Sequence, residues 1–132
     1  MDRLFLDANV LFSAAYRGDA GVQRLWALRD ATLVTSEYSV SEARRNLATP
    51  EQLSRRDSLV ESIEVAPART LDPTLRSEIE LREKDWPILG GAVAAGATHL
   101  ITGDLRDFGP FMGRVVLGVL VLTPARYLNS VR

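Results

Sequence analysis

Apolar residues recur along the chain with two spacings, and these predict strands that alternate with helices. Short apolar runs bounded by polar or turn residues are typical of buried strands, whereas apolar residues at every third or fourth position indicate amphipathic helices. Five segments fit the strand pattern, namely Arg3–Leu6, Thr32–Thr35, Glu64–Ala66, His99–Thr102 and Val119–Leu122.

Helical spacing covers much of the chain between these strands. Residues Pro87–Ala95 are small or apolar on every side, so this helix must be buried, with Gly96 as its C-terminal stop. The predicted helices are Val10–Tyr16, Ala20–Arg29, Tyr38–Ala48, Glu51–Ile63, Pro73–Glu83, Pro87–Ala95 and Ala125–Val131.

This order of elements predicts an α/β fold. Strands that alternate with helices pair in parallel through right-handed crossovers, and helices cover both faces of such a sheet. With 132 residues, we expect one domain over residues 1–132, an α/β/α sandwich around a central parallel sheet of four to five strands. Ligands of such sheets bind outside the carboxyl ends of the strands.

Composition removes several kinds of site. The chain has no cysteine and one histidine, which excludes a cysteine nucleophile, a thiolate zinc site and sites that need two histidines. Its formal net charge of −1 indicates no particular partner. Fifteen of the 16 basic residues are arginine, which suits phosphate binding but also follows from codon usage. The longest apolar run, Val115–Leu122, is too short to span a membrane, so we expect a cytoplasmic protein.

Acidic residues fall where strands end. Asp7 and Asp104 follow two predicted strands, Asp85 precedes the buried helix, and Asp107 lies one short step after Asp104. Neighbouring parallel strands would bring Asp7 and Asp104 to one edge, where like charges need a counter-charge. Oxygen ligands favour Mg²⁺ or Mn²⁺. Alternatively, each of these aspartates caps a helix or turn, although Pro87 would make Trp86 the cap in place of Asp85.

Glu42 is harder to place from the pattern. On its predicted helix it lies about 100° from Ala43, off the apolar stripe. That helix must cross the edge of the sheet for Glu42 to approach Asp7. The alternative is a solvated glutamate beside Arg45 or Asn46.

Several segments resemble those of the PIN domain family, whose members include small metal-dependent ribonucleases. Leu6–Val10 is similar to the family's opening, Ser41–Ala43 to the helix with its second acid, and Lys84–Ala92 to its "Asp, two residues, Ile-Leu, small, small, Ala" segment. Thr98–Phe108 resembles its Thr-x-Asp block, and Val121–Leu128 its usual ending. The resemblance spans nearly the whole chain, although residues 51–81 carry no family signature and residue 99 is histidine where an aromatic is commoner.

The resemblance implies roles for these residues. Asn9 and Thr102 would orient the carboxylates, the alternative being local turn hydrogen bonds. The implied acidic quartet is Asp7, Glu42, Asp85 and Asp104, and the implied metal ligands are Asp7, Asp85, Asp104 and Asp107. We further expect arginines to rim the site and contact RNA phosphates, unless they belong to solvated helix surface. These are Arg17, Arg44, Arg45 and Arg106.

The leading interpretation is a metal-dependent endoribonuclease that uses Mg²⁺ or Mn²⁺ and leaves 5′-phosphate and 3′-hydroxyl ends. The resemblance extends to toxins of the VapC type, which implies a toxin–antitoxin pair with a cognate antitoxin, and a homodimer. The alternative is a catalytically inactive PIN-like module that binds RNA or protein. A receiver domain also gathers aspartates at strand ends, but it needs a lysine after a late strand, and the one lysine here, Lys84, precedes a helix.

Overall fold

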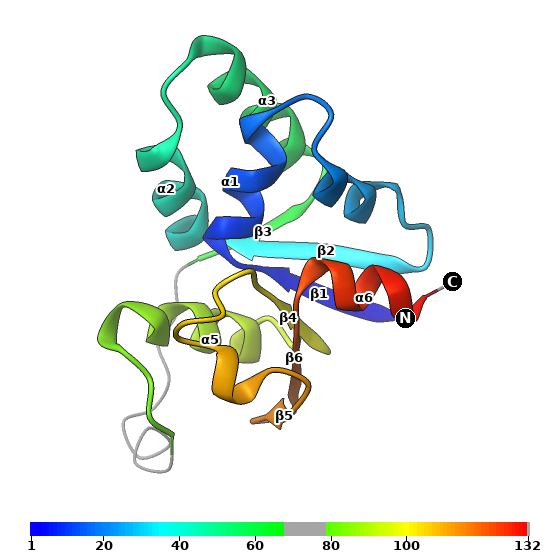
Figure 1. Ribbon diagram of the computed structural model, residues 1–132, viewed down its shortest axis with the longest axis vertical. Coiled ribbons are helices and arrows are strands. Elements are labelled where there is room, and N and C mark those ends of the chain that lie inside the picture. Colours follow the sequence, from blue (N-terminus) through cyan, green and yellow to red (C-terminus); the bar gives the residue numbers. More distant parts are fainter. Residues whose placement is uncertain (68–78, 132) are drawn as a thin grey trace.

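A twisted, mostly parallel sheet runs through the centre of the computed structural model, which describes residues 1–67 and 79–131 (Figure 1). Its strand order is β3-β2-β1-β4-β6-β5. The first five strands of that order are parallel, as predicted, and β5 pairs with β6 in the antiparallel direction. The strands are β1 (Asp2–Leu6), β2 (Ala31–Ser36), β3 (Glu64–Ala66), β4 (His99–Ile101), β5 (Val115–Val116) and β6 (Val119–Leu122).

The short strand β5 was not predicted. It is joined to β6 by Leu117 and Gly118, which both have positive φ, 51° and 84°. Two consecutive residues with positive φ make the tight turn whose twist matches that of an antiparallel hairpin. This turn was not predicted because it lies inside the apolar run Val115–Leu122. Gly118 was the residue in that run that indicated a turn.

Helices pack on both faces of the sheet (Figure 1). The α-helices α2, α3 and α6 begin after a serine or threonine whose hydroxyl accepts a backbone N–H of the first turn. The helices are α1 (Ala8–Tyr16), α2 (Glu37–Asn46), α3 (Pro50–Glu61), α5 (Trp86–Ala94) and α6 (Pro124–Ser130), with 3₁₀ turns η1 (Gly21–Ala27), η2 (Glu83–Asp85) and η3 (Gly109–Phe111).

Two predicted helices differ from the structure. The segment predicted as Ala20–Arg29 forms the 3₁₀ helix η1, whose N-terminus has no side-chain cap. Of the helix predicted over Pro73–Glu83, residues 73–78 lie outside the described residues, residues 79–82 are not helical, and Glu83 opens η2. Ile79 and Leu81 both pack against the core, which an extended chain permits because alternate residues share a face.

Alternate residues of β1 enter two cores, one on each face of the sheet. Leu4 and Leu6 pack with the apolar residues of α1, whereas Phe5 packs with those of α5. Helix α5 is buried as predicted, and its glycine permits a close approach: a Cβ on Gly91 would lie 2.8 Å from Cζ of Phe5. Within residues 1–67 and 79–131, we find no helix with the length and apolar character needed to cross a membrane.

The register between β1 and β4 brings the residues that follow the two strands together at the carboxyl edge of the sheet. Leu6 of β1 pairs with Ile101 of β4, so the residues that follow, Asp7 and Thr102, lie side by side where both strands end. The backbone N–H of Asp7 donates to the carbonyl of Ile101 over 3.0 Å, which extends the pairing to the start of α1.

Candidate active site at the carboxyl edge of the sheet

A pocket of about 440 Å³ opens beyond the carboxyl ends of β1 and β4. It lies between α1 and α2, which pack on one face of the sheet, and α5, which packs on the other (Figure 1). All four members of the acidic quartet line it: Asp7, Glu42, Asp85 and Asp104. Its other lining residues are Ala8, Asn9, Phe12, Tyr38, Ala43, Asn46, Lys84 and Ile88.

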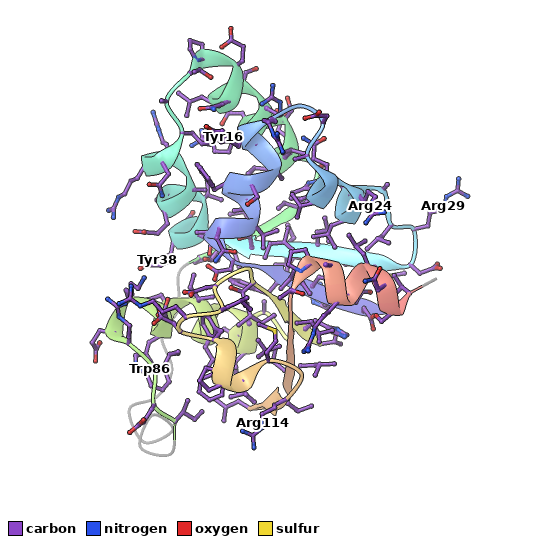
Figure 2. All side chains as sticks on the ribbon, viewed as in Figure 1. Tyr16, Arg24, Arg29, Tyr38, Trp86 and Arg114 are labelled. Carbon is purple, nitrogen blue, oxygen red and sulfur yellow. The ribbon has the colours of Figure 1, made fainter. Side chains whose placement is uncertain are left out.

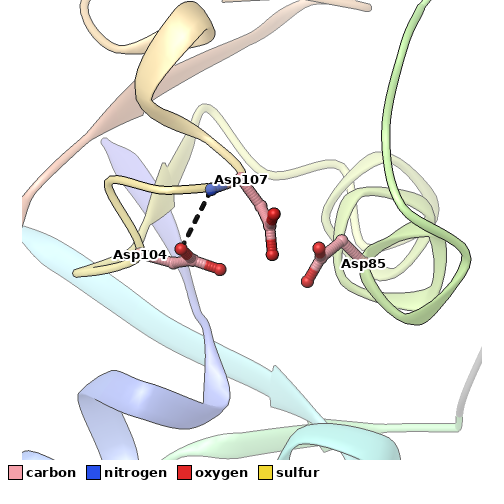
Figure 3. A group of neighbouring side chains, drawn as sticks. All are labelled: Asp85, Asp104 and Asp107. Carbon is pink, nitrogen blue, oxygen red and sulfur yellow. Dashed lines mark hydrogen bonds between the residues drawn. The ribbon is translucent and has the colours of Figure 1, made fainter.

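The carboxylates of Asp85, Asp104 and Asp107 face one another (Figure 3), and the first two of these residues line the pocket. Asp85, Asp104 and Asp107 each offer an oxygen, and the three oxygens lie within 4.8 Å of one another. Oδ2 of Asp85 and Oδ2 of Asp107 are buried and accept no hydrogen bond from the described residues. A buried acceptor without a donor is destabilising, and a bound cation would supply the missing partner to Oδ2 of Asp85.

The charges of Asp85 and Asp107 are strongly linked. Burial and, to a smaller extent, the neighbouring Asp107 carboxylate together raise the pKa of Asp85 to about 7. Although burial opposes the change, the pKa of Asp107 is lowered by the Asp85 carboxyl and by the charges of Arg82 and Lys84. Arg82 Nη1 lies 3.7 Å from Oδ1 of Asp107, and Lys84 Nζ lies 3.5 Å from its Oδ2.

Asp7 is a buried carboxylate held by neighbouring donors. Its Oδ1 accepts the N–H of Ala8 over 2.6 Å, and its Oδ2 accepts the Thr102 hydroxyl over 2.8 Å and the Asn9 amide over 3.1 Å. Burial nevertheless raises its pKa to about 6, and the charge of Asp104 contributes. Asp7 thus caps α1 and also lines the pocket, but it is not one of the three carboxylates within 4.8 Å.

Thr102 and Asn9 join the two strand ends. The Thr102 hydroxyl donates to Asp7 and accepts the N–H of Asp104 over 3.0 Å. Asn9 donates to Asp7 and accepts the N–H of Gly103 over 2.8 Å, a bond that spans 94 residues of sequence. Two of these bonds are local and two are long-range, so Asn9 and Thr102 combine local turn bonding with bonds between the two strand ends.

Asp104 and Glu42 combine both of the interpretations that the sequence left open. Asp104 lines the pocket, while its Oδ1 accepts the N–H groups of Arg106 and Asp107, each over 3.1 Å. Helix α2 does run along the edge of the sheet, so Glu42 lines the pocket. Its Oε1 also accepts a hydrogen bond from Arg45 Nη1 over 2.8 Å, the surface pairing named as its alternative. Asp85, by contrast, makes no side-chain cap to α5.

Two of the four arginines predicted to rim the site contact its acids: Arg45 pairs with Glu42, and the backbone N–H of Arg106 donates to Asp104. Arg17 follows the far end of α1, a helix of nine residues and thus about 14 Å long. None of the predicted arginines, Arg17, Arg44, Arg45 and Arg106, is among the described residues that line the pocket. Lys84 is a cation of the pocket that was not predicted, although its position directly before Asp85 in the sequence indicated it. Tyr38 was missed as well, and its hydroxyl donates to the Lys84 carbonyl over 3.0 Å.

Comparison with known proteins gives a family match and similar solved structures for this chain. A family model described as PIN domain matches residues 3–106. Among solved structures, the chain resembles VapBC2 from Rickettsia felis, bound to a DNA fragment from the promoter, with a TM-score of 0.66 at 16% identity, over 92% of this chain and 98% of that chain. It also resembles VapBC-1 from nontypeable Haemophilus influenzae, with a TM-score of 0.59 at 14% identity, over 93% and 98% of the two chains. Comparison with curated proteins gives no match.

Proposed function

The chain belongs to the PIN domain family, and from this premise we propose that it is a metal-dependent endoribonuclease. The observation that carries the proposal is the meeting of Asp85, Asp104 and Asp107 within 4.8 Å, at a pocket that Asp85 and Asp104 line together with Asp7. Structural ion pairs account for only part of this cluster: Arg82 and Lys84 face Asp107, whereas the buried Oδ2 of Asp85 accepts no hydrogen bond from the described residues.

The donor set fits a hard divalent cation. All the donors are carboxylate oxygens, which suit Mg²⁺ or Mn²⁺ better than zinc. Asp85, Asp104 and Asp107 would hold the ion, and Asp7 would lie next to it. When bound, such an ion polarises a phosphodiester and lowers the pKa of a water molecule.

The chain's own residues prepare the pocket for an anionic substrate. Thr102 and Asn9 hold Oδ2 of Asp7 in place by hydrogen bonds of 2.8 and 3.1 Å, which fixes this carboxylate relative to Asp104. Fixed ligands lose little entropy when a substrate or an ion binds. Phe12 and Ala43 form apolar parts of the pocket wall. The proposed products carry 5′-phosphate and 3′-hydroxyl ends.

We place this nuclease in a toxin–antitoxin pair as a toxin of the VapC type. Support comes from the two VapBC structures, of whose matched chains this chain covers 98%. The proposed partners are RNA, a cognate antitoxin and a second copy of the chain. A small open reading frame directly upstream whose product relieves the growth arrest caused by this chain would support the pairing. Absence of growth arrest on expression would contradict it.

The test of the activity is cleavage of single-stranded RNA in Mn²⁺. Purified wild-type protein should cut the RNA, EDTA should stop the reaction, and Asp104→Asn and Asp85→Asn should each lower the rate by at least about 100-fold. Asp30→Asn is the matched control, because Asp30 is exposed before β2, at the opposite edge of the sheet. RNA binding without cleavage, unchanged in the site variants, would favour the inactive binding module instead.

A further inference from the structure

Lys84 is a cationic residue at a pocket whose other charged lining residues, among those described, are acidic. Of the described residues that line the pocket, where four carboxylates gather, it supplies the one cationic side chain. An RNA strand that approaches these carboxylates meets like charge, and any phosphate gripped inside the pocket needs a donor there. The arginines that were expected to do this are absent from the described lining.

The ion pairs around Asp107 leave Lys84 able to move. Asp107 has two cationic partners, Arg82 at 3.7 Å and Lys84 at 3.5 Å, on different oxygens. If Lys84 turned away, Arg82 would still face the carboxylate. The Asp107 side chain is 7% exposed, whereas that of Lys84 is 56% exposed, so the ammonium group already lies on the solvent side of the pair.

The backbone of Lys84 is held in place while its side chain extends into solvent. Its carbonyl accepts the Tyr38 hydroxyl over 3.0 Å, a bond from α2 across the pocket to η2. The next residue, Asp85, is buried and begins α5. The flexible four-carbon stem of the lysine allows its ammonium group to reach different positions at the pocket mouth from this fixed backbone.

We propose that Lys84 binds a phosphate of the RNA strand at the pocket mouth, as the substrate-contacting cation of this site. The inference rests on the proposed nuclease function and adds the residue that recognises the substrate backbone. The contact is to a phosphodiester oxygen and carries no base preference, because an ammonium group is a point charge without a fixed hydrogen-bonding plane.

The binding test uses the salt dependence of affinity for a short fluorescein-labelled single-stranded RNA, with EDTA present so that no cleavage occurs. One phosphate contact contributes about 0.7 to the slope of log K against log salt for a single strand. Lys84→Gln should therefore lower the slope by about 0.7. Wild-type binding should weaken about threefold more than that of the variant between about 50 and about 200 mM salt.

Two variants separate a contact from a general charge effect. Lys84→Arg keeps the charge and should keep the wild-type slope. Arg29→Gln removes one charge from an exposed position before β2, far from Tyr38 (Figure 2). This variant should also keep the wild-type slope. An unchanged slope in Lys84→Gln would overturn the proposal and leave Lys84 as a counter-ion of Asp107. A decrease in the slope of Arg29→Gln equal to that of Lys84→Gln would also overturn it.

Cleavage kinetics in Mn²⁺ separate this inference from the proposed function. We expect Lys84→Gln to raise KM several-fold while kcat stays within about twofold, since the contact is made equally before and during the reaction. A wild-type protein that neither binds nor cuts RNA would refute the nuclease function. A wild-type protein that cuts RNA with the same KM as Lys84→Gln would refute only the role of Lys84.

Discussion

Asp7 is a buried carboxylate, and its replacement by asparagine should stabilise the metal-free protein at neutral pH. Burial raises its pKa from 3.8 to about 6 in the folded protein. A carboxyl whose folded pKa is raised favours folding below the unfolded value of 3.8, and this contribution is lost as pH rises through about 6. The wild-type protein therefore carries an unfavourable buried charge at pH 7.5 that Asp7→Asn lacks.

The size of the effect follows from the pKa shift. A rise of about 2 pKa units on folding lowers the free energy of unfolding by about 3 kcal/mol once the carboxyl is fully ionised in both states. About 2 kcal/mol of this decrease falls between about pH 4.5 and about pH 7.5. The amide also loses one acceptor bond, from Ala8 or from Thr102, which costs about 1 kcal/mol at both pH values. Comparison of the two pH values cancels this loss.

Urea unfolding in EDTA at both pH values measures the difference. The free energy of unfolding of Asp7→Asn, relative to wild type, should rise by about 2 kcal/mol from about pH 4.5 to about pH 7.5. Asp30→Asn, at an exposed carboxyl, should show no such rise. An Asp7→Asn difference that is the same at both pH values would refute the argument that burial of this charge destabilises the metal-free fold.

Three further predictions concern the core, a helix cap and the ion. Gly91→Ala should lower the free energy of unfolding by about 1–3 kcal/mol in urea titration, because its Cβ would meet Phe5 at 2.8 Å; unchanged stability would contradict this close packing. Thr123→Ala should cost about 1 kcal/mol, because the hydroxyl caps α6 through the N–H of Arg126, and Thr123→Ser should restore most of it. Mn²⁺ at about 100 times its Kd should stabilise the protein by about 2.7 kcal/mol. A melting series should show a smaller increase at lower pH, as protons compete for Asp85.

The sheet and the meeting of the acids could be predicted from the sequence because both depend on local signals. Apolar runs fixed the five parallel strands, and Asp7 and Asp104 follow two of them, so parallel pairing places them at one edge. The hairpin at Leu117 and Gly118 escaped prediction because its turn lies inside an apolar run. Ile79 and Leu81 share one face of an extended chain but would lie about 200° apart on a helix, so their common packing on the core is incompatible with the predicted helix at these positions.

The identity of the cations around the site could not be predicted, because it depends on tertiary geometry. Arg44, Arg45 and Arg106 lie near Glu42 or Asp104 in sequence but are not among the described residues that line the pocket, and Arg45 pairs with Glu42. Lys84 reaches the pocket because η2 and the Tyr38 hydroxyl fix its backbone there. Spacing along the chain also could not show that Asp107, rather than Asp7, completes the three carboxylates within 4.8 Å.

The most direct measurement of the central claim is anomalous diffraction from crystals of the wild-type protein soaked in MnCl₂. The account predicts a manganese peak between the carboxylates of Asp85, Asp104 and Asp107, and loss of that peak in crystals of Asp85→Asn. A pocket that takes up no manganese at high concentration, or a peak only at other carboxylates, would contradict the account.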